Sequence, residues 1–370
     1  MTGIRAKLIN RTFRLTRVIL AVFVFLGVGV GDVAAGVPAH LPGSSGTLWV
    51  TNRTPVGDAL DPTAGSVTVF DAGTLAVIDT ITVGSKPTAV LRAKGTDKLY
   101  VSNGSPSNSV SVISRDTPSV IDAIEMGAGS DPHHMAQSRD GSAVYVALFG
   151  TNKVAVIDTA TDTVRTLEAS GNPRARTHAV WVSTDGRTLY ATNSLGSAAS
   201  SDPGTVSAID VATGSLLWEV VVGRNPSEVL VTDNGKTAYV TFRTEDAVKV
   251  LDLTVDPPTV SATVPIGKQP DTLQLTNDHK TLVVALRGAP AVTLMDAVTL
   301  ETRTVIVEGT TTGHQWLSAN GRYTFLAVVG PSGRSGVAVI DNRTAEVVSG
   351  YEFGGVADPH GIFFEPSKLR

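Results

Sequence analysis

The sequence predicts an all-β fold built from seven similar units, and three observations lead to this prediction. First, an alternating apolar segment that usually ends in aspartate recurs seven times along the chain. Second, glycine is abundant at 36 residues and aromatic residues make up only 5%, as suits short strands and tight turns. Third, the repeats begin without a first strand and end with one strand too many. Together these features predict a closed, seven-bladed β-propeller with four-stranded blades.

The recurring apolar segment is expected to be the third strand, strand C, of each blade. Its copies end, in chain order, at Asp71, Ser114, Asp158, Asp210, Asp252, Asp296 and Asp341. Successive copies are 43, 44, 52, 42, 44 and 45 residues apart, a period typical of propeller blades. Because the aspartates recur so regularly, we expect their side chains to cap the turn that follows rather than to catalyse.

The other three strands of each blade have their own signals. Strand A precedes a tight turn such as Asp140-Gly141, and dipeptides of this kind are strong hairpin signals. Strand B follows with a Tyr-Val-Thr-like pattern, as at residues 99–103. Strand D ends at a glycine such as Gly223, after which a proline such as Pro226 opens the next blade.

The two ends of the repeat region are expected to close the ring. The first unit begins at strand B, residues 48–52, and has no strand A of its own. The last segment, residues 359–364, reads as a strand A without partners. Pairing these two segments would complete one blade and remove the edges that both would otherwise expose.

The strand-B segments 48–52 (LWVTN) and 99–103 (LYVSN), with the Val-x-Val-Ile-Asp strand and the Gly-x-x-Pro junction, resemble the YVTN-type propeller repeat family. The resemblance covers roughly residues 46–366 and is specific for the fold. It implies a relation to surface-layer repeats, to lactonase-type propellers, and to the propeller domains of nitrous oxide reductase and haem-containing nitrite reductase. Because this fold hosts enzymes, cofactor holders and plain scaffolds, the resemblance does not name one function. Ser114 and the longer fourth blade depart from the pattern.

The N-terminus has the pattern of an export signal. Five basic residues precede or border an apolar run of 13 residues at 18–30, and Val33-Ala34-Ala35 offers a cleavage site after Ala35. The alternative is an uncleaved anchor, but the run is shorter than the ~20 residues of a spanning helix. We therefore expect a signal peptide at 1–35, a linker at 36–45, the propeller at 46–366 and a tail at 367–370. The expected location is secreted, extracytoplasmic or at the cell surface.

Composition excludes several classes of function. The chain has no cysteine, so disulfides, thiolate metal sites and cysteine nucleophiles are ruled out. Residues 1–35 carry five positive charges and one negative, so cleavage would change the net charge from −4 to −8. An acidic protein without a basic run is a poor ligand for nucleic acid or for an anionic membrane surface. We expect a monomer whose partner is a protein or a small-molecule ligand.

Histidines recur near the start of strand A, the innermost strand, whose entry end rims the central channel. They are His133, His134, His178, His314 and His360. His133 and His178 lie eight residues before the turn glycine, and His360 follows its proline as His133 does; His134 and His314 share the next position. Glu228 and Asp271 occupy the corresponding positions of two further blades. The seven side chains are therefore candidates for a shared site.

Two interpretations of these histidines stay open. Imidazole clusters bind copper or zinc, and the resemblance supports this, because the nitrous oxide reductase propeller holds copper with histidines on such a rim. The positions here do not reproduce that full set. In the alternative interpretation the histidines belong to a repeated turn and bond only to backbone. Glu228 and Asp271 would either complete a mixed histidine–carboxylate site or simply be solvated.

Loop lengths point to one face of the propeller. The long excursions, at residues 53–64, 104–108 and 194–204, all join strand B to strand C. B–C loops and D–A junctions lie on the same face, which we therefore expect to be the functional face. Insertions that are merely tolerated in these loops would give the same pattern. Arg174 and Arg176 lie in a junction there and are candidates to meet an anion.

Three hypotheses for function follow. The first is an exported scaffold that binds a ligand or protein through this face. The second is a metal-assisted hydrolase or lyase of the lactonase-propeller type, with the five histidines as ligands or general bases. The third, a copper or haem redox domain, is disfavoured because the sequence has no electron-transfer domain. The sequence does not decide whether the protein is an enzyme.

Overall fold

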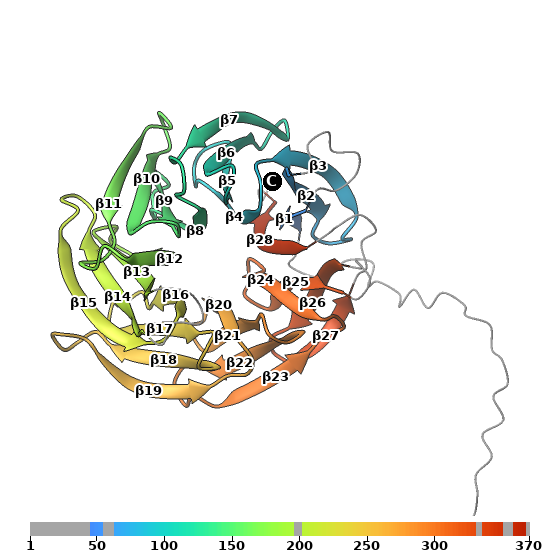
Figure 1. The fold of residues 1–370 in the computed structure, drawn as a ribbon. Coiled ribbons are helices and arrows are strands. Elements are labelled where there is room, and N and C mark those ends of the chain that lie inside the picture. Colours follow the sequence, from blue (N-terminus) through green and yellow to red (C-terminus); the bar gives the residue numbers. More distant parts are fainter. Residues whose placement is uncertain (1–44, 55–62, 196–201, 331–334, 351–357, 368–370) are drawn as a thin grey trace, which may run out of the picture. The chain divides into compact units, whose positions relative to one another are not determined.

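The computed structural model describes residues 45–54, 63–195, 202–330, 335–350 and 358–367. These residues form seven four-stranded antiparallel sheets arranged as the blades of a propeller around a central channel (Figure 1). The predicted all-β, seven-bladed fold is confirmed. The expected signal peptide, linker and most of two long loops lie outside the described residues. Among the described residues, none forms a helix long and apolar enough to cross a membrane.

The strands of each blade follow in chain order from the innermost to the outermost, except in the blade that joins the chain ends. That first blade consists of β28 (Pro359–Pro366), β1 (Gly46–Asn52), β2 (Gly65–Asp71) and β3 (Val77–Val83). Blades two to four are β4 (Pro87–Arg92), β5 (Lys98–Asn103), β6 (Ser109–Ser114), β7 (Ser119–Glu125); β8 (Pro132–Gln137), β9 (Ala143–Leu148), β10 (Lys153–Asp158), β11 (Val164–Glu168); and β12 (Ala175–Val182), β13 (Thr188–Leu195), β14 (Gly204–Asp210), β15 (Leu216–Gly223). Blades five to seven are β16 (Pro226–Val231), β17 (Thr237–Phe242), β18 (Ala247–Asp252), β19 (Thr259–Pro265); β20 (Pro270–Leu275), β21 (Thr281–Leu286), β22 (Ala291–Asp296), β23 (Thr302–Ile306); and β24 (Thr311–Leu317), β25 (Tyr323–Val329), β26 (Ser335–Asp341), β27 (Glu346–Gly350).

The ring closes as the sequence predicts. β28 pairs antiparallel with β1, placing Trp49 opposite Phe363 and Val50 opposite Ile362. The rings of Phe363 and of Trp316 in blade seven also make a T-shaped contact, with 4.9 Å between the ring centroids. The C-terminal strand therefore joins blade one to its neighbour as well as to the N-terminal strand.

The core lies between blades, because the middle strands of each blade are covered on both faces. β2 is buried along almost its whole length, whereas the outermost strand β7 is mostly exposed. This difference explains why strand C reads as apolar and strand D alternates or is polar. The expected turn caps are also present: Asp71 Oδ1 accepts the N–H of Gly73 and Thr74, at 3.0 and 2.7 Å. Equivalent bonds are made by Asp158, Asp210, Asp252, Asp296 and Asp341.

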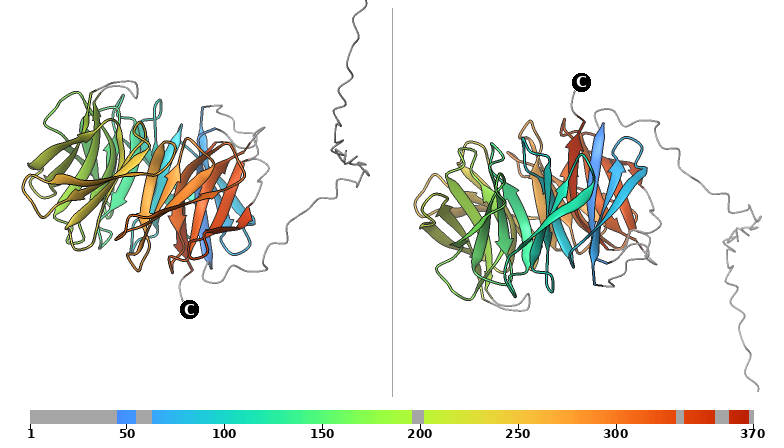
Figure 2. Two further views of the ribbon diagram at one scale, coloured as in Figure 1. Left: turned by 90° about the horizontal axis from the view of Figure 1, so that it is seen from below. Right: turned by 90° about the horizontal axis from the view of Figure 1, so that it is seen from above.

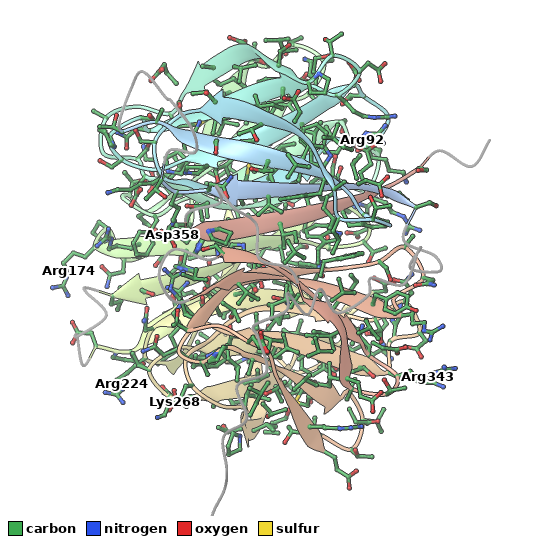
Figure 3. The ribbon with its side chains drawn as sticks, turned by 90° about the vertical axis from the view of Figure 1, so that its right-hand side faces the viewer. Arg92, Arg174, Arg224, Lys268, Arg343 and Asp358 are labelled. Atoms are coloured by element: carbon green, nitrogen blue, oxygen red, sulfur yellow. The ribbon has the colours of Figure 1, made fainter. Side chains whose placement is uncertain are left out.

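The two faces of the propeller differ in the segments that they carry. Side views show strands running from one face to the other (Figure 2). Arg174, Arg224 and Lys268, from D–A junctions, lie on one face, which we call the entry face (Figure 3). Arg92, the last residue of β4, and Arg343, from a C–D turn, lie on the opposite face, which carries the A–B and C–D turns and which we call the turn face (Figure 3).

Candidate functional site

Every innermost strand carries a β-bulge at its entry end. The bulged residues are Thr88; His133 and His134; His178; Ser227 and Glu228; Asp271 and Thr272; Gly313 and His314; and His360 and Gly361. A bulge leaves its extra residue outside the ladder and re-aims the side chain. All seven sequence-predicted histidine and carboxylate positions are bulged residues, at one level of the channel.

The strand-B motif supports these bulges, which gives the sequence signature a physical role. Thr51, Ser102, Thr192 and Thr241 accept a backbone N–H of their own blade from a bulged residue or from the residue directly after the bulge, at 2.7 to 3.1 Å. Thr192 and Thr241 also donate their hydroxyls to the bulge carbonyl of the next blade, each at 2.7 Å. The asparagine that ends the motif donates to strand-C hydroxyls, as Asn103 does to Ser109 and Ser111. The motif thus fixes the rim on which the candidate site stands.

The five rim histidines form one continuous cluster of rings. Ring centroids are 4.9 Å apart for His133 and His134, 4.4 Å for His133 and His178, 4.6 Å for His134 and His314, and 4.5 Å for His314 and His360. All five side chains are buried. The histidine rings therefore lie together at one level of the channel rather than in separate loops.

Three of these histidines can share a metal ion. His133, His134 and His178 each offer a ring nitrogen, and these atoms lie within 4.8 Å of one another. His133 Nδ1, His134 Nε2 and His178 Nε2 are buried without a hydrogen-bond partner among the described residues. With Zn–N bonds of ~2.1 Å in a tetrahedron, the nitrogens need to approach by at most about 1.5 Å. The residues present therefore fit copper or zinc, the metals that imidazole suits.

The surroundings of His133 and His178 favour the neutral imidazole, in which one ring nitrogen keeps its lone pair. His178 Nδ1 lies 2.8 Å from the carbonyl oxygen of Ser227, a bond that directs Nε2 toward the cluster as an acceptor. Burial lowers the pKa of His133 and of His178 well below the ordinary value; His178 adds to the effect on His133, and Arg243 to that on His178. Neutral imidazole is the form that binds a metal.

The two candidate carboxylates have different surroundings. Asp271 is fully buried, and its Oδ1 accepts the hydroxyl of Ser227 at 2.6 Å and two N–H groups of Arg243, from Nε and Nη2. Burial alone would raise the pKa of Asp271, but Arg243 and its neighbours hold it well below the ordinary value. Glu228 lies closer to the histidines: its Oε1 is 3.5 Å from His134 Nδ1, and its Oε2 accepts the N–H of Leu273. Neither carboxylate is simply solvated.

The two candidate arginines do not join the histidine cluster. Arg174 is exposed on the entry face, and its backbone N–H bonds to Asn172 Oδ1. Arg176 donates to the carbonyl of Phe149 at 3.1 Å and stacks over the Phe149 ring. Because Phe149 in turn contacts His133 and His178, Arg176 supports the site from outside.

Sequence analysis missed three other arginines that reach the channel mouth. Arg53, Arg243 and Arg287 each follow strand B directly, after Asn52, Phe242 and Leu286. Arg287 Nη1 lies 3.6 Å from Asp271 Oδ2 and 3.2 Å from His360 Nδ1. The sequence carries a signal for them, since an arginine stands at the same repeat position, directly after strand B, in three blades.

The channel contains a small cavity below the histidines and a larger one at its other end. The first, of about 60 Å³, is lined by His134, His314 and Glu228 among others. The second, of about 440 Å³, opens on the turn face between Trp181, Trp316 and residues of the A–B turns. Both cavities border Trp316 and Gln274, so these two side chains separate the ends of the channel.

Comparison with solved structures shows the same fold in proteins of several kinds. Kuenenia stuttgartiensis hydrazine synthase is 22% identical with a TM-score of 0.63, covering 82% of this chain and 97% of that chain. A Pseudomonas aeruginosa periplasmic gluconolactonase is 21% identical, also with a TM-score of 0.63, covering 86% and 99%. A putative 6-phosphogluconolactonase from Bacteroides fragilis is 15% identical with a TM-score of 0.65, covering 87% and 98%. At these identities the likeness establishes the fold alone.

Comparison of sequences identifies the family. No curated protein sequence matches the chain. The sequence model of one family of propellers matches residues 169–363, more than half of the chain, and this span includes four of the seven blades and three of the rim histidines. In agreement with the YVTN-type resemblance of its strand-B motifs, the chain belongs to the YNCE-like β-propeller family.

Proposed function

We propose that this propeller is an exported binding protein that holds a copper or zinc ion at the entry end of its channel and binds its ligand there. The observation that carries the proposal is the set of three buried imidazoles, His133, His134 and His178: one ring nitrogen of each lies within 4.8 Å of the others, and each ring has a buried nitrogen without a hydrogen-bond partner among the described residues. Leaving three such acceptors unpaired costs free energy, and a shared metal ion would satisfy all three. When bound, the ion would polarise an oxygen ligand or activate water.

Metal content tests the proposal. The mature protein, purified without chelator, is expected to contain about one copper or zinc ion per chain by elemental mass spectrometry. His178→Ala removes one of three ligands and is expected to reduce the metal content at least tenfold, whereas His279→Ala, at an exposed turn histidine, is expected to leave it unchanged. Intact mass of the same sample reports whether residues 1–35 have been removed. A parent protein without metal after incubation with both ions would contradict the proposal.

A second candidate function is metal-assisted hydrolysis or elimination, and the position of Glu228 favours it. Its carboxylate borders His134 and the channel cavity, and its side chain is 20% exposed. A carboxylate at that place can accept a proton from a substrate or from water beside the histidines.

Glu228→Gln tests this second function without removing a histidine. If the zinc-loaded parent hydrolyses a sugar lactone, the variant is expected to lose about 10²–10⁴-fold in kcat, as for loss of a general base, while keeping its metal. Equal turnover by parent and variant would remove Glu228 from the reaction, and no turnover by the metal-loaded parent would favour the binding function.

A further inference from the structure

The arginines at the channel mouth are not equally neutralised. Arg243 donates two hydrogen bonds to Oδ1 of Asp271, and Arg287 Nη1 lies 3.6 Å from the other oxygen of that carboxylate. Arg53 has no carboxylate within 4 Å among the described residues. Its Nη2 bonds to Thr88 Oγ1 at 3.3 Å, and its Nε is buried without a partner.

Arg53 and Arg287 also act on each other. Burial lowers the pKa of Arg53, and the positive charge of Arg287 is the next largest cause, while the carboxylates of Asp358 and Asp271 act in the opposite direction. Both side chains affect His360, which Arg287 contacts directly. Two guanidinium groups, one of them without a carboxylate within 4 Å among the described residues, therefore face the same end of the histidine cluster.

We propose that Arg53 and Arg287 form a site for a small oxyanion, a carboxylate or phosphate group, at the mouth of the channel. The guanidinium fork matches the oxygens of such groups and bonds them in a two-point geometry. The Arg287 side chain is 33% exposed and Arg53 is half-buried, so an anion can reach both from solvent. His314 Nε2, buried without a partner among the described residues, offers a further polar atom in the same cluster.

This inference rests on the proposed function in taking the entry face as the ligand-binding face, and it adds the chemical class of the ligand. The anion would lie beside the histidines, where a bound metal ion adds to its attraction. The acidic mature chain makes nucleic acid an unsuitable source of the phosphate. A small free organic acid or phosphate compound fits the confined mouth.

Calorimetry on metal-free protein at low ionic strength tests the site, with oxalate and inorganic phosphate as separate probes. Saturable binding of at least one probe is expected, weakened at least tenfold in Arg53→Gln and in Arg287→Gln. Arg53→Lys, which keeps the charge but not the fork, is expected to fall between. Arg224→Gln makes the same charge change at an exposed arginine of the entry face and is expected to bind as the parent does.

The outcomes separate this inference from the metal proposal. No binding of either probe, or equal binding by parent and Arg53→Gln, overturns the anion site whatever the metal content. Anion binding by a protein that takes up no metal supports the anion site and overturns only the proposed metal site. Circular dichroism verifies that each variant is folded; should Arg287→Gln not fold, the partly exposed Arg53 decides the result.

Discussion

The metal-free protein is expected to lose stability steeply as the pH falls below about 6.5. Burial is the main reason that the pKa of each of four rim histidines lies well below its ordinary value, and nearby imidazoles and arginines add to the effect. The four are His133, His178, His314 and His360. Arg53, Arg243 and Arg287 are the cations that face them, and Asp271 is the buried anion.

The sign of the effect follows from proton uptake. Below pH 6.5 the unfolded chain takes up protons on these histidines, whereas the folded protein does not. Stability is therefore fully present above pH 6.5 and is lost as the pH falls toward the folded-state pKa values. Each histidine contributes a slope of about 1.4 kcal/mol per pH unit, so four give up to about 5 kcal/mol per unit. That is comparable with the whole stability of many proteins.

Urea unfolding in the presence of a chelator at pH 7.5, 6.5 and 5.5 measures this slope. His360→Gln replaces a titrating side chain with a neutral one and is expected to reduce the slope by about a quarter, in proportion to one proton of four. His279→Ala, at an exposed histidine outside the cluster, is expected to retain the full slope. Unchanged stability from pH 7.5 to 5.5 would mean that the cluster accepts protons in the folded state.

Removal of the C-terminal strand is expected to abolish cooperative folding. β28 buries Ile362, Phe363 and Phe364, and Phe364 stacks on Phe325 of blade seven with 5.4 Å between centroids. At about 1.5–3 kcal/mol for each large apolar side chain, the loss is roughly 5–9 kcal/mol before any backbone hydrogen bond is counted. The truncation would also expose the inner edge of β1.

Thermal unfolding followed by near-ultraviolet circular dichroism compares a chain ending at residue 357 with one lacking only residues 368–370. The longer chain keeps β28 and is expected to melt as the parent does, while the shorter chain is expected to show no cooperative transition. If both chains unfold at the same midpoint, closure through β28 contributes little and the inter-blade contacts suffice.

The fold was predictable because its signals are local and repeated. The strand that ends at Asp71 returns six more times, and the missing strand A at one end matches the orphan strand at the other. The shared positions of His133, His178 and His360 were likewise visible as distances from a turn glycine or proline.

The polar contacts of the site were not predictable in the same way. Asp271 is fully buried and lies against both Arg243 and Arg287. This arrangement depends on the relative orientation of neighbouring blades, which the repeat pattern in the sequence does not specify. The bulges were hidden as well, because they depend on a hydroxyl such as that of Thr192 bonding to the backbone of two blades at once. Both features arise only when the ring is assembled.

The bulged entry of each inner strand has a consequence for how this protein can change over time. A bulged side chain leaves the ladder and faces the channel, so its identity is separated from the apolar positions that hold blade against blade. The bulged positions of the seven inner strands, from Thr88 in blade two to His360 in blade one, are therefore equivalent positions around one channel mouth. Substitution at one of these positions changes the lining of the channel while the apolar positions between blades stay the same. Proteins with this ring can thus evolve to bind a new ligand through successive substitutions at single bulged positions.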